Sequence, residues 1–133
     1  MNSYIYEQNQ ARVTEEVNSM TIKILIVDDA DDLREIIAEL LRSYDYSVEV
    51  AKDGIEALGC AVVFNPDIIL SDMKMPNMSG PDLKKLLSVN VLTASIPVIF
   101  MSGFSSEFPG TDVHILQKPF TIPQLIKALA RVL

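Results

Sequence analysis

The chain has 133 residues, of which 49% are hydrophobic and 22% are charged. This composition is typical of one folded domain with a packed core and excludes a disordered chain. The 11 basic and 18 acidic residues give a formal net charge of −7, which argues against nucleic-acid binding because phosphate contacts need a basic surface.

Residues 1–20 are polar and only weakly patterned. Five side chains in this stretch could form the apolar face of a short helix: Tyr4, Ile5, Tyr6, Val13 and Val17. The weak pattern favours a flexible extension over a helix. We therefore assign the folded domain to residues 21–133.

The first predicted strand is residues 22–27, a short β-branched run that ends at Asp28 and Asp29. A helical pattern follows, and its apolar face is formed by Leu33, Ile36, Ile37, Leu40 and Leu41. Asp29, Asp31 and Asp32 suit the first helical turn, where the helix dipole favours negative charge. This structural explanation is weakest for Asp28, which ends the strand. Paired carboxylates at a strand end also offer the hard oxygen ligands that suit Mg²⁺.

The next elements are an edge strand at residues 46–51, where side chains alternate, and a helix at residues 55–64 that Gly59 weakens. The third strand is the apolar run 68–70, which ends on the carboxylate of Asp72. Taken alone, Asp72 is equally well explained as a loop or capping residue. A loop follows, and a third helix begins at Gly80.

The last third of the chain predicts two more strands, residues 96–101 before Ser102 and residues 113–117 before Lys118. Between them, residues 104–112 are too few for an average helix and contain a Pro-Gly pair, so we expect at most one helical turn. A capping box that begins at Thr121 starts the final helix.

The alternation of strands and helices predicts a parallel sheet that is covered on both faces. Polar side chains follow the carboxyl ends of four of the predicted strands: Asp28, Asp29, Asp72, Ser102 and Lys118. Because these strand ends share one edge of a parallel sheet, we expect the five side chains to converge there, where ligands bind in open α/β sheets.

The sequence resembles the receiver domain of two-component response regulators over about residues 22–133. The matching motifs are Val27-Asp28-Asp29, the stretch from Asp72 to Gly80, Met101-Ser102-Gly103 and Lys118-Pro119-Phe120. The resemblance implies a flavodoxin-like, doubly wound α/β fold with a five-stranded parallel sheet of order 2-1-3-4-5. The short segment before the fifth strand leaves the family's fourth helix shortened or missing.

The resemblance also implies a role for each residue of the cluster. Asp72 would be the nucleophile that takes a phosphoryl group from a phosphohistidine. Mg²⁺ would be held by Asp28, Asp29, Asp72 and the backbone carbonyl of Lys74. The phosphoryl group would accept a hydrogen bond from Ser102 and would pair with Lys118.

The family further implies a cis peptide bond at Pro119, which aims the preceding lysine into the pocket. Receivers commonly carry an aromatic switch residue three positions before this lysine, and here that position is Ile115. The usual switch through Ser102 and an aromatic side chain is therefore altered. We expect the signal to be read from the pocket rim, formed by residues 73–78, Phe104 and the start of the first helix.

The implied protein is a stand-alone receiver, or a relay intermediate between a kinase and a phosphotransfer protein, that phosphorylates itself and is not a turnover enzyme. Its partners would be a sensor histidine kinase or a histidine phosphotransfer protein, and an unknown downstream protein. The single cysteine, Cys60, excludes an intrachain disulfide and is interpreted as a core residue. No signal-peptide pattern is present, and no apolar run approaches the roughly 18 residues of a membrane span. We expect a cytoplasmic protein with no membrane or nucleic-acid partner.

Two alternative functions remain open at this point. The first is a binding scaffold that keeps the fold without the switch. The second is a Mg²⁺-dependent phosphohydrolase with an aspartyl nucleophile, which needs a second acid two residues after that nucleophile. The position is occupied by Lys74, which argues against the hydrolase.

Overall fold

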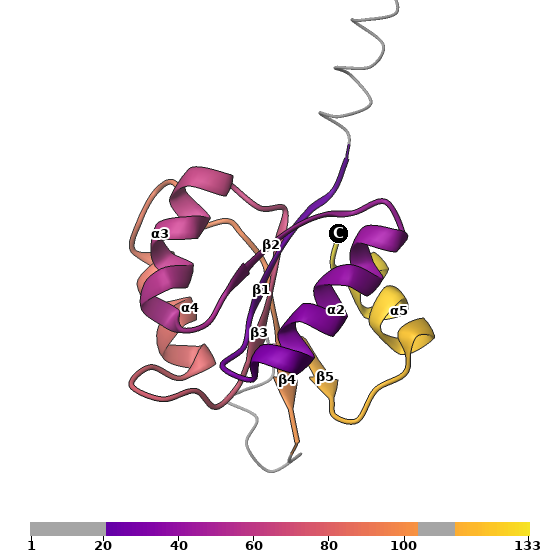
Figure 1. Ribbon diagram of the computed structural model, residues 1–133. Helices are drawn as coiled ribbons and strands as arrows, with labels where there is room; N and C mark the ends of the chain where they lie inside the picture. Colours follow the sequence, from indigo (N-terminus) through magenta and orange to yellow (C-terminus); the bar gives the residue numbers. More distant parts are fainter. Residues whose placement is uncertain (1–20, 104–113) are drawn as a thin grey trace, which may run out of the picture.

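The computed structural model describes residues 21–103 and 114–133 (Figure 1). The expected extension at residues 1–20 and the short segment at residues 104–112, with Phe104, lie outside the described residues. Within the described part, no helix is long and apolar enough to cross a lipid bilayer.

The centre of the molecule is a parallel five-stranded sheet. Its strands are β1 (Lys23–Val27), β2 (Ser47–Ala51), β3 (Ile68–Asp72), β4 (Val98–Ser102) and β5 (His114–Gln117). Their order is β2-β1-β3-β4-β5, and all four neighbouring pairs are parallel, which confirms the predicted topology. As predicted, β2 is an edge strand.

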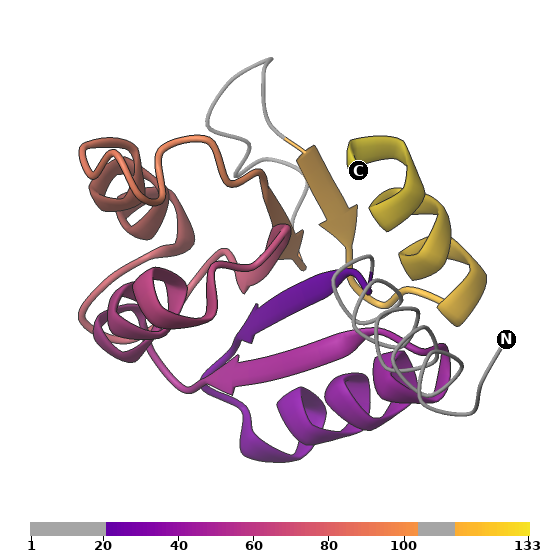
Figure 2. The ribbon, with the colours of Figure 1, turned by 90° about the horizontal axis from the view of Figure 1, so that it is seen from above.

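Helices cover both faces of the sheet, as Figure 2 shows. They are α2 (Asp31–Ser43), α3 (Gly54–Phe64), α4 (Gly80–Ser88) and α5 (Ile122–Val132). One face packs against α2 and α5, and the other packs against α3 and α4. The described residues form four helices, and the segment where the sequence predicts a shortened or missing helix lies outside them.

The inner strands are buried because side chains on both of their faces meet a helical layer. Residues 24–27 of β1, residues 68–71 of β3 and all of β4 are buried. This explains why their sequences are almost continuously apolar and lack the alternation of a one-sided sheet. The half-buried Cys60 on α3 lies beside the core, outside its fully buried part.

Local signals in the sequence fix where most helices begin. The Asp53 side chain accepts a hydrogen bond from the N–H of Glu56 at the start of α3. Capping boxes at Ser79 and Thr121 begin α4 and α5, the second of them as predicted. The strand expected at residues 96–101 begins two residues later, after Pro97, which has no N–H to donate to a neighbouring strand.

Candidate functional site

Three carboxylates meet at the carboxyl edge of the sheet. Asp28 and Asp29 follow β1, and Asp72 is the last residue of β3, the neighbouring strand. One carboxylate oxygen from each of these residues lies within 4.8 Å of the other two. The parallel pairing of β1 with β3 thus brings together acids that are 43 or 44 positions apart in the sequence.

The most deeply buried member of the cluster is Asp28, which has no exposed surface. Its backbone N–H donates to the carbonyl of Ala51, and its Oδ1 accepts a hydrogen bond of 2.9 Å from the N–H of Ala30. The other oxygen, Oδ2, is buried and has no hydrogen-bond partner. A buried carboxylate oxygen in this state is a ready acceptor for a cation or a donor group.

Lys118 supplies a positive charge to this cluster. Its Nζ lies 3.3 Å from Oδ1 of Asp72 and 3.6 Å from Oδ2 of Asp28. The lysine backbone is fixed next to β4, because its N–H donates to the carbonyl of Ser102 over 2.7 Å. The peptide bond between Lys118 and Pro119 is cis.

The electrostatic environment of Asp72 disfavours its charged form. Burial raises the pKa of this carboxyl above its ordinary value, and the negative charges of Asp28 and Asp29 raise the pKa further. The ammonium of Lys118 and its hydrogen bond act in the opposite direction. The pKa remains raised because burial, the largest of these effects, is only partly offset by Lys118.

This donor set fits Mg²⁺. The ion prefers carboxylate, carbonyl and water oxygens at about 2.0–2.1 Å, which places two ligand oxygens at most about 4.2 Å apart. The three carboxylate oxygens already lie within 4.8 Å of one another. In addition, Oδ2 of Asp28 lies 3.6 Å from the ammonium of Lys118 and has no hydrogen-bond partner.

The remaining residues expected at the site lie around this cluster. Ser102 is buried at the end of β4, next to β3. Lys74 is exposed and lies two residues beyond Asp72, in the loop between β3 and α4. Ile115 lies on β5 opposite Phe100 and is half-buried against the core. His114, the single histidine, is exposed at the start of β5.

Two further residues shape the site, Gly80 and Arg34, although the sequence analysis gave neither of them a role in it. A Cβ atom on Gly80 would lie 2.5 Å from the backbone oxygen of Asp72, so only glycine allows α4 to begin so close to the strand end. Arg34, on α2, donates from Nη1 to the backbone oxygen of Asp28 over 2.9 Å. The only sequence signal for Arg34 is its position three residues after Asp31 on a helix.

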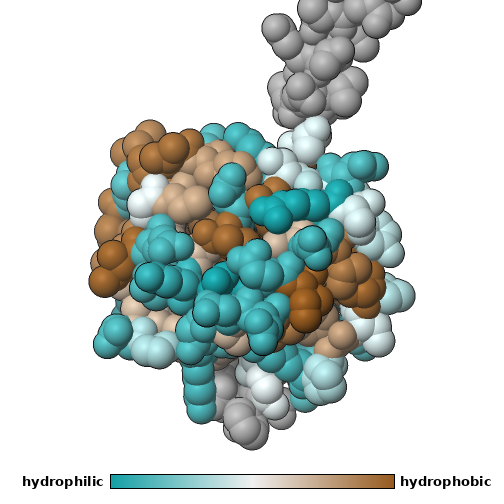
Figure 3. Space-filling model, in the orientation of Figure 1, coloured by the Kyte–Doolittle hydropathy of each residue, from teal (hydrophilic) through white to brown (hydrophobic). Residues whose placement is uncertain are grey.

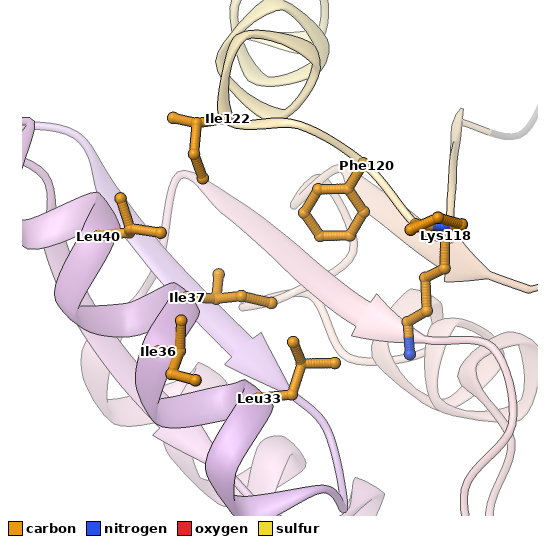
Figure 4. Close-up of a pocket in the computed structure, with 8 residues that line it drawn as sticks. Leu33, Ile36, Ile37, Leu40, Lys118, Phe120 and Ile122 are labelled. Carbon is orange, nitrogen blue, oxygen red and sulfur yellow. The ribbon is translucent and has the colours of Figure 1, made fainter.

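An apolar groove borders the acidic cluster on the side of α2 and α5. It has a volume of about 420 Å³ and is lined by Leu33, Ile36, Ile37, Leu40, Lys118, Pro119, Phe120 and Ile122. Figure 4 shows the α2 side chains facing Phe120 and Ile122, with Lys118 at one end of the groove. Hydrophobic side chains are also gathered over α2 and α5 in Figure 3.

Comparison with known proteins assigns a family to this arrangement. The sequence profile of the response regulator receiver domain matches residues 24–130. A probable transcriptional regulator, ycf29 of Pyropia yezoensis, is 33% identical over an alignment of 116 residues that covers 83% of this chain and 52% of that protein. This chain therefore spans about half the length of that relative. The polar-differentiation response regulator DivK of Brucella ovis is 29% identical over 118 residues, covering 83% of this chain and 94% of DivK.

Solved structures show the same similarity. The chemotaxis response regulator CheY4 of Vibrio cholerae has a TM-score of 0.78 and 32% sequence identity, covering 86% of this chain and 100% of that one. The receiver domain of the hybrid histidine kinase CckA has a TM-score of 0.71 and 36% identity, covering 83% of this chain and 97% of that one.

Proposed function

The chain belongs to the family of response regulator receiver domains, and we propose that it accepts a phosphoryl group on Asp72 from a phosphohistidine in a Mg²⁺-dependent reaction. Receiver domains are signalling proteins that interact with histidine kinases or phosphotransfer proteins and with downstream targets. The observation that carries the proposal is the contact of 3.3 Å between Lys118 and Asp72 within the acidic cluster.

Asp72 is the nucleophile in this proposal. A carboxylate oxygen of Asp72 attacks the phosphorus, an O–P bond forms, and the P–N bond to the donor histidine breaks. The electron pair of the broken bond stays on the imidazole of the donor. The product is an acyl phosphate on Asp72, and the half-buried position of this side chain limits access to a donor that fits the edge of the sheet.

Lys118 and Ser102 stabilise the transferred group. Lys118 already bridges Asp72 and Asp28, so a small movement of its ammonium transfers the contact from the carboxylate to a phosphoryl oxygen. Ser102 ends the strand next to Asp72 and carries a hydroxyl that can donate to the same group. We include Ile115 with Ser102 as the switch pair, since Ile115 is half-buried at the position of the usual aromatic residue.

The residues that would hold the metal are Asp29, Asp72, Asp28 and the backbone carbonyl of Lys74. When bound, Mg²⁺ supplies positive charge that neutralises the phosphoryl oxygens as they approach the carboxylates. The proximity of the three acidic side chains supports this assignment. Asp28 and Asp29 orient their oxygens toward the reacting carboxylate and contribute charge for binding the cation.

The apolar groove between α2 and α5 is the proposed docking surface for the phosphodonor protein. It ends at Lys118, so a helix laid along it would bring a donor histidine to the edge that carries Asp72. Ile36 is 57% exposed there, which leaves an apolar side chain free for contact with a partner. A groove of this kind suits the apolar face of an amphipathic helix.

The proposal is tested by intact-mass measurement after incubation with Mg²⁺ and acetyl phosphate. We expect the wild type to gain one phosphoryl group that hydroxylamine removes, and Asp72→Ala to gain none. Equal labelling of the variant would show that Asp72 is not the acceptor. An unlabelled wild type would favour a scaffold without a switch, and sustained turnover of small phosphate esters would favour a phosphohydrolase.

A further inference from the structure

We propose that Arg34 is a positioning residue for the metal-binding loop, and that its guanidinium sets the affinity of the acidic cluster for Mg²⁺. This inference rests on the proposed function, since it concerns the same cation. Arg34 does not itself contact the cation in this proposal. It acts by fixing the backbone that carries Asp28 and Asp29.

The loop between β1 and α2 consists of only three residues, Asp28, Asp29 and Ala30. Arg34 binds the loop on both sides of Asp29. Its Nη1 donates to the backbone oxygen of Asp28 over 2.9 Å, and its own N–H donates to the backbone oxygen of Ala30, also over 2.9 Å. The exposed Asp29 is thus flanked by two bound carbonyls, one held by the Arg34 side chain and the other by the first regular hydrogen bond of α2.

The other terminal nitrogen of the guanidinium, Nη2, pairs with an aspartate outside the acidic cluster. Four aspartates occur among residues 28–32, yet only Asp28 and Asp29 converge with Asp72. Asp31 is instead paired with Arg34, whose Nη2 lies 2.8 Å from its Oδ1. Asp31 is 79% exposed and is held on the outer side of the helix start. The same arginine therefore anchors one acid of the loop and keeps another away.

The environment of Arg34 favours a fixed geometry over a loose surface charge. Its side chain is only 12% exposed, and its Nε is buried. A guanidinium presents its donors in a rigid plane, so the contacts to Asp28 and Asp31 orient each other. A lysine at this position has one ammonium and cannot reproduce that plane.

A matched control exists at the other end of the same helix. Arg42 lies in the last turn of α2, and its Nη2 donates to the backbone oxygen of Val48 over 2.9 Å. Both arginines thus bind α2 to a backbone carbonyl, Arg34 in the loop that follows β1 and Arg42 within β2. Only Arg34 does so next to the acidic cluster. If the arginines only hold the helix in place, both substitutions should change the Mg²⁺ affinity equally.

The test is calorimetric titration of the full chain with MgCl₂, comparing the wild type with Arg34→Met and Arg42→Met. We expect Arg34→Met to raise the Kd for Mg²⁺ about tenfold or more, as is typical when an outer partner of a metal ligand is lost. We expect Arg42→Met to leave the Kd unchanged. The direction of the change in Kd distinguishes this role from a purely electrostatic one. Removing a nearby positive charge without moving the loop would strengthen cation binding and lower the Kd.

Arg34→Lys is the second variant in case Arg34→Met does not fold. It keeps the charge and loses the planar donors, so we also expect a weaker Mg²⁺ affinity. A Kd equal to that of the wild type or lower in the folded Arg34 variants would overturn the inference while leaving the proposed function intact. If the wild type does not bind Mg²⁺, both the Mg²⁺ dependence of the proposed reaction and the proposed role of Arg34 are contradicted. If the wild type binds Mg²⁺ but Asp72 is not phosphorylated, only the proposed function fails.

Discussion

The ammonium of Lys118 lies 3.3 Å from Oδ1 of Asp72, although the two residues are 46 positions apart in the sequence. The same ammonium lies 3.6 Å from Oδ2 of Asp28. Among the ion pairs of residues 21–103 and 114–133, this ammonium contacts two of the three clustered carboxylates, so three negative charges face one positive charge there. We expect this excess of negative charge to attract a cation and to destabilise the folded state when no cation is bound.

We predict that Asp72→Asn stabilises the protein at pH 7 when Mg²⁺ is absent. The substitution removes one of three crowded charges while Lys118 keeps its contact with Asp28, and we expect a gain on the order of 1 kcal/mol. The measurement is the free energy of unfolding in urea, made in the presence of a chelator. A less stable variant would mean that the charge of Asp72 is well compensated in the folded state.

The same comparison should depend on pH in a defined direction. Because the pKa of Asp72 is raised in the folded state, mainly by burial, the folded protein holds this proton at a pH where the unfolded chain has lost it. The stability of the wild type relative to Asp72→Asn should therefore fall as the pH rises from 3.8, the ordinary value, through the folded-state pKa. Below that window the disadvantage of the wild type should disappear, and a constant difference at all pH values would contradict this assignment.

We predict that Mg²⁺ raises the melting temperature through Asp29. At free Mg²⁺ one hundred times above the Kd, binding adds about 2.7 kcal/mol to the free energy of unfolding. Asp29→Ala should lose this response, since it removes a ligand of the cluster. Lys74→Ala is the control, because the proposed ligand there is the backbone carbonyl and the variant should respond like the wild type. A full response in Asp29→Ala would place the metal elsewhere.

Two glycines provide a matched test of the close approach between β3 and α4. A Cβ on Gly80 would meet the Asp72 carbonyl at 2.5 Å and the Phe100 ring at 2.9 Å, so Gly80→Ala should cost about 1–3 kcal/mol of stability. A Cβ on Gly59, in α3, would meet nothing within 4 Å, and Gly59→Ala should add about 0.5–1 kcal/mol. Midpoints of urea unfolding report both values. Equal effects at the two positions would refute the close contact.

We predict that Ile36→Glu impairs phosphorylation by a protein donor and spares phosphorylation by a small molecule. The rate from a phosphohistidine-bearing phosphotransfer protein active on the wild type should fall about tenfold or more, because burying an isoleucine contributes about 1.5–3 kcal/mol. The rate from acetyl phosphate should not change. Ile55→Glu on α3 is the control, since Ile55 is even more exposed, at 71%, and lies outside the groove. Similar losses in both variants would exclude the groove as the docking surface.

The order of strands and helices could be predicted from the sequence because it depends on local patterns. Apolar runs of five or six residues, separated by amphipathic stretches and turns, permit few arrangements other than a parallel sheet between two helical layers. The convergence of Asp28, Asp29, Asp72 and Lys118 followed from the same pattern, since parallel strands place their carboxyl ends at one edge. Strand boundaries were less certain and shifted by one or two residues, as at Pro97.

The tertiary structure alone decided how these groups meet. The burial of Asp28, the distances from Lys118 to two carboxylates and the raised pKa of Asp72 depend on strand register and on how the layers close over the edge. The contact of Arg34 with the Asp28 carbonyl depends on the backbone path of a three-residue loop. A sequence determines which side chains are polar and, to within one or two residues, where an element ends, because those properties are local. Distances of 3 to 4 Å between groups far apart in the chain are set by the packing of the whole domain.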